Sequence, residues 1–412
     1  MIDPSLARDL PRAARPARIA VSAMFFVNGA IMASILPRLP AIKDGLGLSN
    51  AELGAAVAAI PVGGLIAGGL VGTLIGRYGS DRVAMIAGTL AALTLLAVGT
   101  AGSWLALAGA ALVLGMFDAT MDASMNAHSL GVQRQYGRSI LQGFHGMWSL
   151  GSMAAGAAGA IAAGLGVPVA IHLAFAAAAL SVTAFLAGRR FLPAAVADAH
   201  HDDVTAAERI HVRNAPRLLR LLVPIALLGI LCVVLQSAAA TWSAVYLTDI
   251  LRQPEGIAAS AYVLYMAAMV VGRLTNDRWV DRWGATAVVR VGALIGAAGI
   301  ALAIAAGPAD LALLAFAGFA LVGIGSSPMF PVMVGAAGTR PGIPVGHAVA
   351  IVAWLVRLGL VVAPALIGAA ADAFGLGAAL GVPLLAAVVI AVAAPHLTGA
   401  TRPARVARPA AT

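Results

Sequence analysis

The sequence contains two short charged segments, "IGRYGSDR" at residues 75–82 and "DRWVDRWG" at residues 277–284, in a chain of which only 10% is charged. We call them the first and second knots. Asp281 falls 205 residues after Gly76, about half of the 412-residue chain. Each knot combines arginine, aspartate and glycine between long apolar runs. Two matching polar segments half a chain apart predict a protein built from two similar halves.

The composition indicates that lipid is the solvent for most of the surface. Hydrophobic residues make up 61% of the chain and the mean hydropathy is +0.95, whereas soluble domains have roughly 45–50% apolar residues. The single cysteine, Cys232, excludes an intramolecular disulfide and a cysteine-based zinc site. The net charge of +9 is concentrated in short connections and tails, which favours a role in membrane topology over nucleic-acid binding.

Apolar runs long enough to cross a bilayer, which takes about 20 residues in a helix, recur twelve times. Their approximate ranges are 19–37, 51–75, 83–102, 104–129, 141–164, 167–188, 219–247, 257–276, 285–306, 309–334, 345–370 and 376–395. These lengths suit helices and not the shorter strands of a barrel. We therefore expect an all-α integral membrane protein with twelve transmembrane helices in two pseudo-symmetric six-helix bundles.

The most polar segment, residues 189–217, has no apolar period and predicts a linker. It divides the chain into an N-terminal bundle, residues 1–188, and a C-terminal bundle with a basic tail, residues 218–412. Within it, "DAHHDD" offers His200 and His201 as metal ligands. A solvated loop is the better interpretation, because adjacent histidines lack a helical ligand spacing, and we expect no metal.

The distribution of cations predicts the topology. The two tails and every second connection hold 22 of the 26 lysines and arginines. The opposite side carries Arg38, Lys43 and Arg252. Both termini should therefore be cytoplasmic in a bacterial inner membrane. The N-terminal run lacks a clear cleavage site, so we expect an uncleaved first helix behind a basic tail.

The same offset relates two tryptophans, since Trp148 in "HGMWSLG" and Trp354 in "IVAWLVR" lie 206 residues apart. With these residues the chain resembles the major facilitator superfamily over nearly its whole length. The knots look like the family's loop signature, G-x-L-x-x-D-R-x-G-R-R, between helices 2 and 3 and again between helices 8 and 9. The two copies are "GTLIGRYGSDR" at residues 72–82 and "GRLTNDRWVDRWG" at residues 272–284.

Finer features resemble one bacterial subfamily, that of the rhizopine-associated membrane protein and related sugar or drug transporters. They are "DASMNAHSLGVQRQYGRSILQGFHGMWSLGS" at 122–152, "WSAVYLTD" at 242–249 and "GIGSSPMFPV" with "AAG" behind it at 323–338. The resemblance implies a secondary transporter whose halves rock around a midplane site. The rival interpretations are a non-transporting sensor and a membrane enzyme. An enzyme is disfavoured because H-E-x-x-H, G-x-S-x-G and cysteine clusters are lacking.

The resemblance also implies that the knots form a cytoplasmic latch, in which ion pairs join the loop to neighbouring helix ends when that side is closed. The latch residues are Arg77, Asp81, Arg82, Asp277, Arg278, Asp281 and Arg282. The alternative is that these charges only anchor the loops on the cytoplasmic side. The family's aspartate is replaced by Gly76 in the first copy and kept as Asp281 in the second, so the second latch should be the stronger.

Small residues recur along two spans at a spacing that places them on one helical face. Glycines of this kind let helices approach closely in lipid, and they are Gly64, Gly68, Gly72 and Gly76 in the second span, and Gly151 and Gly159 in the fifth. The resemblance implies that helices 2 and 5 pack against helices 11 and 8 of the other half. Rocking and static packing both fit this pattern.

Polar residues inside the spans mark the expected pathway, because ionisable groups at membrane depth are costly and usually functional. Asp118, Asp122 and Asn126 share one face of the fourth span. Repulsion between the two carboxylates would favour proton uptake by one of them. Alternatively, Asp122 pairs with Arg134 or Arg138 near the end of its helix. Asn28 in the first span joins this set.

Histidine and tryptophan add further candidates. His145 either carries protons or hydrogen-bonds across helices. Trp148 and Trp242 would offer ring faces to a sugar-like or cationic substrate, although Trp242 also suits an interfacial anchor.

Arg357 lies deep in the eleventh span, where a guanidinium requires a partner or a water-filled cavity. We expect it to bind an anionic group of the substrate, or else to pair with a carboxylate. The subfamily's usual acidic pair in the seventh span is replaced by Gln236 and Thr241. The expected partners are therefore an anionic or zwitterionic small molecule, a proton and the lipid bilayer. We expect a monomer with no cofactor and no nucleic-acid partner.

Overall fold

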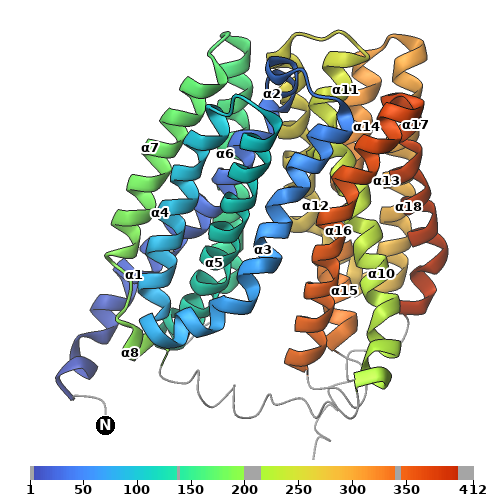
Figure 1. Ribbon diagram of the computed structural model, residues 1–412. Coiled ribbons are helices and arrows are strands. Elements are labelled where there is room, and N and C mark those ends of the chain that lie inside the picture. The colour runs from blue at the N-terminus through green and yellow to red at the C-terminus, as the bar shows by residue number, and fades with distance from the viewer. Residues whose placement is uncertain (1–3, 137–139, 199–214, 339–344, 398–412) are drawn as a thin grey trace, which may run out of the picture.

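The structure, a computed structural model, describes residues 4–136, 140–198, 215–338 and 345–397. Within these ranges the chain is helical and contains no strand (Figure 1). The N-terminal half consists of α1 (Pro4–Ile35), η1 (Leu36–Arg38), α2 (Leu39–Leu46), α3 (Asn50–Tyr78), α4 (Ser80–Gly99), α5 (Trp104–Tyr136), α6 (Leu141–Gly164) and α7 (Val169–Gly188), and α8 (Ala194–Ala197) follows in the linker. The C-terminal half consists of α10 (Ala215–Ala240), α11 (Ser243–Asp249), α12 (Glu255–Trp283), α13 (Ala285–Ala309), α14 (Ala312–Ser326), α15 (Met329–Gly338), α16 (Val345–Phe374), α17 (Leu376–Ala379), α18 (Gly381–Ala393) and η3 (Ala394–Leu397).

Eleven helical segments of the described chain are long and apolar enough to cross a membrane. They correspond to eleven of the twelve expected spans. The twelfth, α6, forms as a helix of 24 residues. Its glycines, serines, histidine and glutamine make it less apolar than the others. Such small and polar residues are common where transmembrane helices pack closely or line a pathway.

The two knots adopt the same backbone conformation, which confirms the repeat seen in the sequence. Gly79 ends α3 and precedes α4 with φ 84° and ψ 150°, and Gly284 ends α12 and precedes α13 with φ 82° and ψ 154°. These two glycines are also 205 residues apart. Such positive φ angles are readily available only to glycine. Each knot therefore turns the chain sharply between two long helices.

The two halves meet along α3 with α16 and along α6 with α12 (Figure 1). These are the helix pairs that the resemblance implies, 2 with 11 and 5 with 8. We call the end that holds α2 and α11 the distal end, and the end that holds α8 the linker end. A Cβ atom added to Gly54 would lie 2.3 Å from the carbonyl oxygen of Pro364, and one on Gly256 would lie 2.4 Å from the Cα of Gly164. Backbone therefore packs on backbone at the distal end.

Charged groups reinforce this distal contact. Lys43 of α2 forms an ion pair with Asp249 of α11, and both side chains are largely buried, with 12% and 26% exposed. The carboxylate of Asp372 on α16 accepts hydrogen bonds from the backbone N–H groups of Asn50 and Ala51, each 2.9 Å long. Asp372 thus caps the first turn of α3 in the other half, where a negative charge also complements the helix dipole.

At the linker end, the predicted packing glycines Gly68, Gly72 and Gly76 of α3 make no such contact with a described residue. A Cβ atom added to Gly68, Gly72 or Gly76 would have no described atom within 4 Å. Gly143 and Gly146 of α6 are equally open. In this conformation the halves are joined at the distal end, and the glycine-bearing faces of α3 and α6 at the linker end carry no packed partner among the described residues.

The remaining predicted packing glycines touch their own half and not the other one. Gly64 faces Ala119 of α5, at 3.2 Å from a built Cβ to the Cβ of that alanine. Gly151 lies against the backbone of Phe26 in α1, and Gly159 lies against Pro37 of η1. These three glycines lie close to neighbours in their own half, and the contacts across the halves are made by other glycines. A spacing of four residues fixes a helical face without fixing which neighbour that face meets.

Gly54 and Gly72, both on α3, give a matched pair of variants. Gly54→Ala should push the halves apart at the distal end, because the added methyl meets the carbonyl of Pro364 at an impossible distance. Gly72→Ala should leave the structure unchanged, since its methyl enters open space. Distances between spin labels on α2 and α11 should lengthen only in Gly54→Ala. Equal distances in the two variants would contradict the packing described here.

Candidate functional site

The centre of the N-terminal half is built on a close approach of α1 and α6. A Cβ atom added to Gly29 would lie 2.1 Å from the carbonyl oxygen of Trp148, and one on Gly151 would lie 2.1 Å from that of Phe26. Only glycine permits such an approach. It brings the side chain of Asn28 on α1 beside the ring of Trp148 on α6.

Asn28 then joins three helices through one side-chain amide. Its nitrogen donates to Asp118 Oδ1 on α5 over 2.8 Å, and its oxygen accepts from the indole N–H of Trp148 over 3.0 Å. The orientation of the amide follows from the partners, because a carboxylate accepts and an indole N–H donates. Asn28 is itself buried, so this bridge fixes the positions of Asp118 and Trp148.

One turn further along α5, Asp122 is held by Asn126. The amide of Asn126 donates to Asp122 Oδ1 over 3.0 Å and to the backbone carbonyl of Asp122 over 2.8 Å. Asp118 and Asp122 are both only partly buried. Each carboxylate therefore keeps lone pairs for a substrate or a proton after its asparagine has bound.

Positive charge reaches these carboxylates from two other helices. Arg357 of α16, in the opposite half, attracts both Asp118 and Asp122. No ion pair within 4.0 Å joins Arg357 to a described carboxylate. His145 of α6 interacts electrostatically with Asp122, and its Nδ1–H donates to Leu141 O over 3.0 Å. Its ring centre lies 5.3 Å from that of Phe25.

The structure thus groups seven of the nine predicted pathway residues. Six of them form one cluster in the N-terminal half, and an arginine of the C-terminal half attracts the carboxylates of that cluster. The seven residues are Asn28, Asp118, Asp122, Asn126, His145, Trp148 and Arg357. We call this set the central cluster. It places opposite charges on the two halves, so a substrate with separated charges can bridge them.

Trp242 is not part of this cluster. Its side chain is completely buried in the C-terminal half, and its indole nitrogen has no acceptor among the described residues. The chain turns at Thr241 and Trp242 between α10 and α11, and α11 packs on α12. In this conformation the ring is available neither to a substrate nor to the membrane interface. Gln236 lies on α10 and is partly exposed, and within the described residues no hydrogen bond or ion pair joins it to the central cluster.

Most of the described latch side chains are exposed, and Asp81 is partly buried. The side chains of Arg77, Arg82, Arg278, Asp281 and Arg282 are exposed, and the guanidinium of Arg77 lies 5.4 Å from the ring centre of its neighbour Tyr78. Within the described residues no ion pair involves a knot. The side chain of Asp277 lies outside the described residues. A latch would engage only with the linker end closed, so it stays a prediction.

The alternative partners of Asp122 are also placed in part. Arg134 donates to the carbonyl of Ala197 over 2.6 Å, so its side chain is bound to the start of the linker. Arg138 lies outside the described residues. His200 and His201 of the "DAHHDD" segment also lie outside them, and the described chain contains no group of three His, Cys, Asp or Glu side chains arranged to hold a metal.

Sequence reasoning missed a polar junction beneath the first knot. Asp198 accepts from the backbone N–H and the hydroxyl of Ser80, over 3.0 and 2.7 Å, at the first turn of α4. The same hydroxyl lies 3.0 Å from His128 Nδ1, whose ring stacks on Phe191 at 4.3 Å. Because the hydroxyl donates to Asp198, Nδ1 must carry the proton in this pair. The junction fastens the start of the linker to α4 and α5.

Sequence reasoning also missed the distal ion pair. The sequence marks Lys43 and Arg38 only as cations on the side of the membrane that the predicted topology leaves poor in them. Two cations on the side of the membrane that should be poor in cations do indicate a structural or functional role. Asp249 ends the "WSAVYLTD" segment, but nothing in the sequence indicates which cation it meets.

Comparison with known proteins matches most of this chain. A family model described as Major Facilitator Superfamily matches residues 21–339. An uncharacterized MFS-type transporter of Yersinia pestis is 30% identical over 379 residues, which cover 91% of this chain and 94% of the relative. An uncharacterized transporter of Sinorhizobium fredii is 30% identical over 92% of this chain and 97% of its own length. Membrane protein MosC of Rhizobium meliloti is 26% identical over 91% of this chain and 88% of its own length.

Solved structures share the fold at lower identity. The nucleoside transporter NupG superposes with a TM-score of 0.76 at 15% identity, over 92% of this chain and 98% of that one. A bacterial homolog of the human lysosomal transporter Spinster, in an inward-facing and unoccupied conformation, gives 0.74 at 13% identity over 93% and 97%. A D-xylose–proton symporter gives 0.70 at 14% identity over 94% and 98%. At such identities the likeness concerns the fold alone.

Proposed function

The chain belongs to the major facilitator superfamily, and we propose that it moves a small polar organic solute across the membrane by rocker-switch alternating access. It is a multi-pass membrane transporter of this family and not an enzyme. The observation that carries the proposal is the asymmetry of the interface between the halves. They pack backbone to backbone at the distal end, while the glycine faces of α3 and α6 at the linker end stand open. Residues 1–188 and 218–412 are the two rocking units, joined by the linker at 189–217.

The distal contact is of a kind that can be broken and remade. It consists of close glycine packing, one ion pair and one side-chain cap on a helix terminus. Such contacts depend on geometry, so a small rotation loses all of them together. The open linker-end faces offer a second surface of the same type. The protein would then alternate between two packed interfaces around the central cluster.

The central cluster supports a zwitterionic or anionic substrate coupled to a proton. Arg357 would hold the anionic group from the C-terminal half. Asp122 or Asp118 would face a cationic group or carry a proton from the N-terminal half, and His145 lies where it can exchange that proton. Trp148 adds a ring face held in place by Asn28. Among the structural neighbours, one is a nucleoside transporter and another a D-xylose–proton symporter, which is consistent with a small polar cargo and proton coupling.

The topology completes the proposal. The charge distribution favours cytoplasmic termini in a bacterial inner membrane. The distal end then faces outward, and the present conformation is inward-facing, as is the Spinster homolog named above. We propose that the monomer is the transporting unit, since each six-helix half finds its partner in the same chain.

A ligand screen followed by flux measurement tests the proposed function. Purified protein is heated with sugars, sugar acids, amino acids, inositol derivatives and cationic drugs, since a ligand at ~100 times its Kd stabilises by about 2.7 kcal/mol. Compounds that raise the unfolding temperature are then tested for uptake into proteoliposomes. Uptake of a stabilising compound supports the proposal. A ligand that binds but is never transported would make the protein a sensor and contradict it.

Asp118→Asn separates proton coupling from substrate binding. The asparagine keeps an oxygen that accepts from Asn28, so the geometry of the cluster should persist. It cannot take up a proton, so accumulation driven by a pH gradient should fall by about 100-fold, the loss typical of a positioned proton-transfer group. Exchange of labelled for unlabelled substrate should continue. Asn126→Ala serves as the comparison, and equal loss of both activities in Asp118→Asn would show a purely structural role.

A further inference from the structure

Arg38 is a buried cation whose donors are mostly unused. It lies in η1 near the distal end and is only 3% exposed. One guanidinium nitrogen donates to the carbonyl oxygen of Val167 over 2.7 Å. The other two, Nε and Nη1, are buried without an acceptor among the described residues. Buried charged donors without partners are rare in native proteins, because each one costs several kcal/mol.

The immediate surroundings of Arg38 do not neutralise it. His172 of α7 interacts electrostatically with Arg38, and its Nδ1 is also buried without a partner in the described chain. The opposite charge that acts on Arg38 comes from Glu255, the first residue of α12, in the other half. Glu255 is exposed and lies beyond the 4.0 Å that defines an ion pair.

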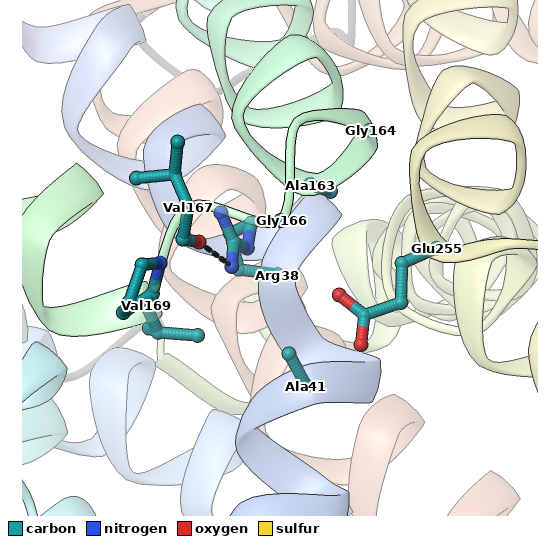
Figure 2. A pocket seen from close by; sticks show the side chains of 9 residues that line it. Arg38, Ala41, Ala163, Gly164, Gly166, Val167, Val169 and Glu255 are labelled. Carbon is teal, nitrogen blue, oxygen red and sulfur yellow. Dashed lines mark hydrogen bonds between the residues drawn. The ribbon is translucent and has the colours of Figure 1, made fainter.

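A pocket separates these two charges. It has a volume of about 520 Å³ and lies between the turn that joins α6 to α7 and the start of α12. Arg38 and Glu255 contribute to its lining, and most of the rest is small or backbone-exposing: Ala41, Ala163, Gly164 and Gly166. Figure 2 shows Arg38 beside Val167 and the Gly164–Gly166 turn. The Glu255 carboxylate lies apart from them, on the right of the view.

We propose that this distal pocket binds a small zwitterion, with its carboxylate toward Arg38 and its ammonium group toward Glu255. A simple anion would be attracted by Arg38 and repelled by Glu255. A simple cation would be attracted by Glu255 and repelled by Arg38. A molecule with both charges can pair its anionic group with Arg38 and its cationic group with Glu255. A carboxylate accepts strong hydrogen bonds from a guanidinium, and an ammonium group pairs with a carboxylate at modest cost because Glu255 is already solvated.

The site belongs to both halves, which gives its occupant a defined effect. Its walls come together where Gly164 of α6 meets Gly256 of α12, and these residues belong to opposite halves that pack here in the distal-closed conformation. A zwitterion in this pocket therefore favours the distal-closed conformation, in proportion to its preference for that state. This site is separate from the central cluster and does not depend on whether the protein transports.

Charge-matched probes test the proposal on the full-length protein in detergent. The probes are glycine, β-alanine and γ-aminobutyrate as zwitterions of increasing length, with acetate and ethylammonium as single-charge controls at equal ionic strength. At least one zwitterion should raise the unfolding temperature of the wild type, and the two controls should not. The effect should persist in Arg357→Ala, which removes the cation of the central cluster.

Glu255→Gln is the decisive variant, because Glu255 is exposed and its replacement should not impair folding. The apparent Kd for the zwitterion should rise by about fivefold, the upper end of the loss expected for an exposed ion pair, while acetate should become a ligand. Asp310→Asn, another exposed distal carboxylate, should change neither value. Arg38→Lys should weaken binding of the zwitterion, and in the Glu255→Gln background it should weaken binding of acetate as well.

Three results would overturn the proposal. They are the absence of stabilisation by any zwitterion in the wild type, equal stabilisation by acetate, and an unchanged Kd in Glu255→Gln.

Discussion

Arg357→Ala should abolish substrate uptake while leaving the protein folded. Arg357 is the cation from the C-terminal half that attracts Asp118 and Asp122, and it has no ion-pair partner within 4.0 Å among the described carboxylates. Removing it leaves the substrate anion without a donor and leaves two carboxylates facing each other uncompensated. Loss of a desolvated charged contact costs about 2–5 kcal/mol, so uptake at low substrate concentration should fall by at least about 30-fold.

Two further variants show whether Arg357 acts through its charge or its shape. Arg357→Lys keeps the charge but loses the planar fork that binds a carboxylate through two bonds, so it should recover only part of the uptake. Arg290→Ala removes an exposed arginine of α13 and should leave uptake unchanged. If Arg357→Ala transported normally, Arg357 would not be the anchor, and the search would move to Asp122, Asn126 and Trp148.

Lys43→Glu should shift the protein away from the distal-closed conformation. The substitution replaces the ion pair with Asp249 by two facing carboxylates, both largely buried. Juxtaposed like charges cost several kcal/mol, enough to change the ratio of two conformations by about 100-fold or more. Labels on α2 and α11 should then report a longer distance, and sites lining the central cluster should become accessible from the distal side.

The double variant Lys43→Glu with Asp249→Lys provides the control for this effect. It restores an ion pair with the partners exchanged and should return the distance to that of the wild type. Arg252→Glu makes the same charge reversal at an exposed distal arginine and should have no effect. A shift in Arg252→Glu, or none in Lys43→Glu, would show that distal closure does not depend on this ion pair.

Features with a fixed spacing along the chain were predictable from the sequence. The spans follow from runs of about 20 apolar residues, and the repeat follows from an offset near 205 that holds for both knots and for Trp148 and Trp354. The structure adds that Gly79 and Gly284 share one backbone conformation. The resemblance correctly paired α3 with α16 and α6 with α12.

Contacts between distant segments were less predictable. The sequence placed Asp118, Asp122 and Asn126 on one face, but not the bridge from Asn28 to Trp148, which depends on the close approach at Gly29 and Gly151. Trp242 was misplaced because the turn between α10 and α11 cannot be seen in an apolar run. The ion pair of Lys43 with Asp249 joins residues 206 positions apart, and a single sequence carries no information about such a partner.

The central claim is that the two ends of the molecule open and close in opposition. Paired spin labels are placed at the distal end on α2 and α11, and at the linker end on the α3 and α12 segments next to the knots. Distances are measured in the wild type and in Lys43→Glu. We predict that the distal distance lengthens in the variant while the linker-end distance shortens. A distal distance that lengthens with no change at the linker end, or two distances that lengthen together, would contradict alternating access by rocking of the two halves.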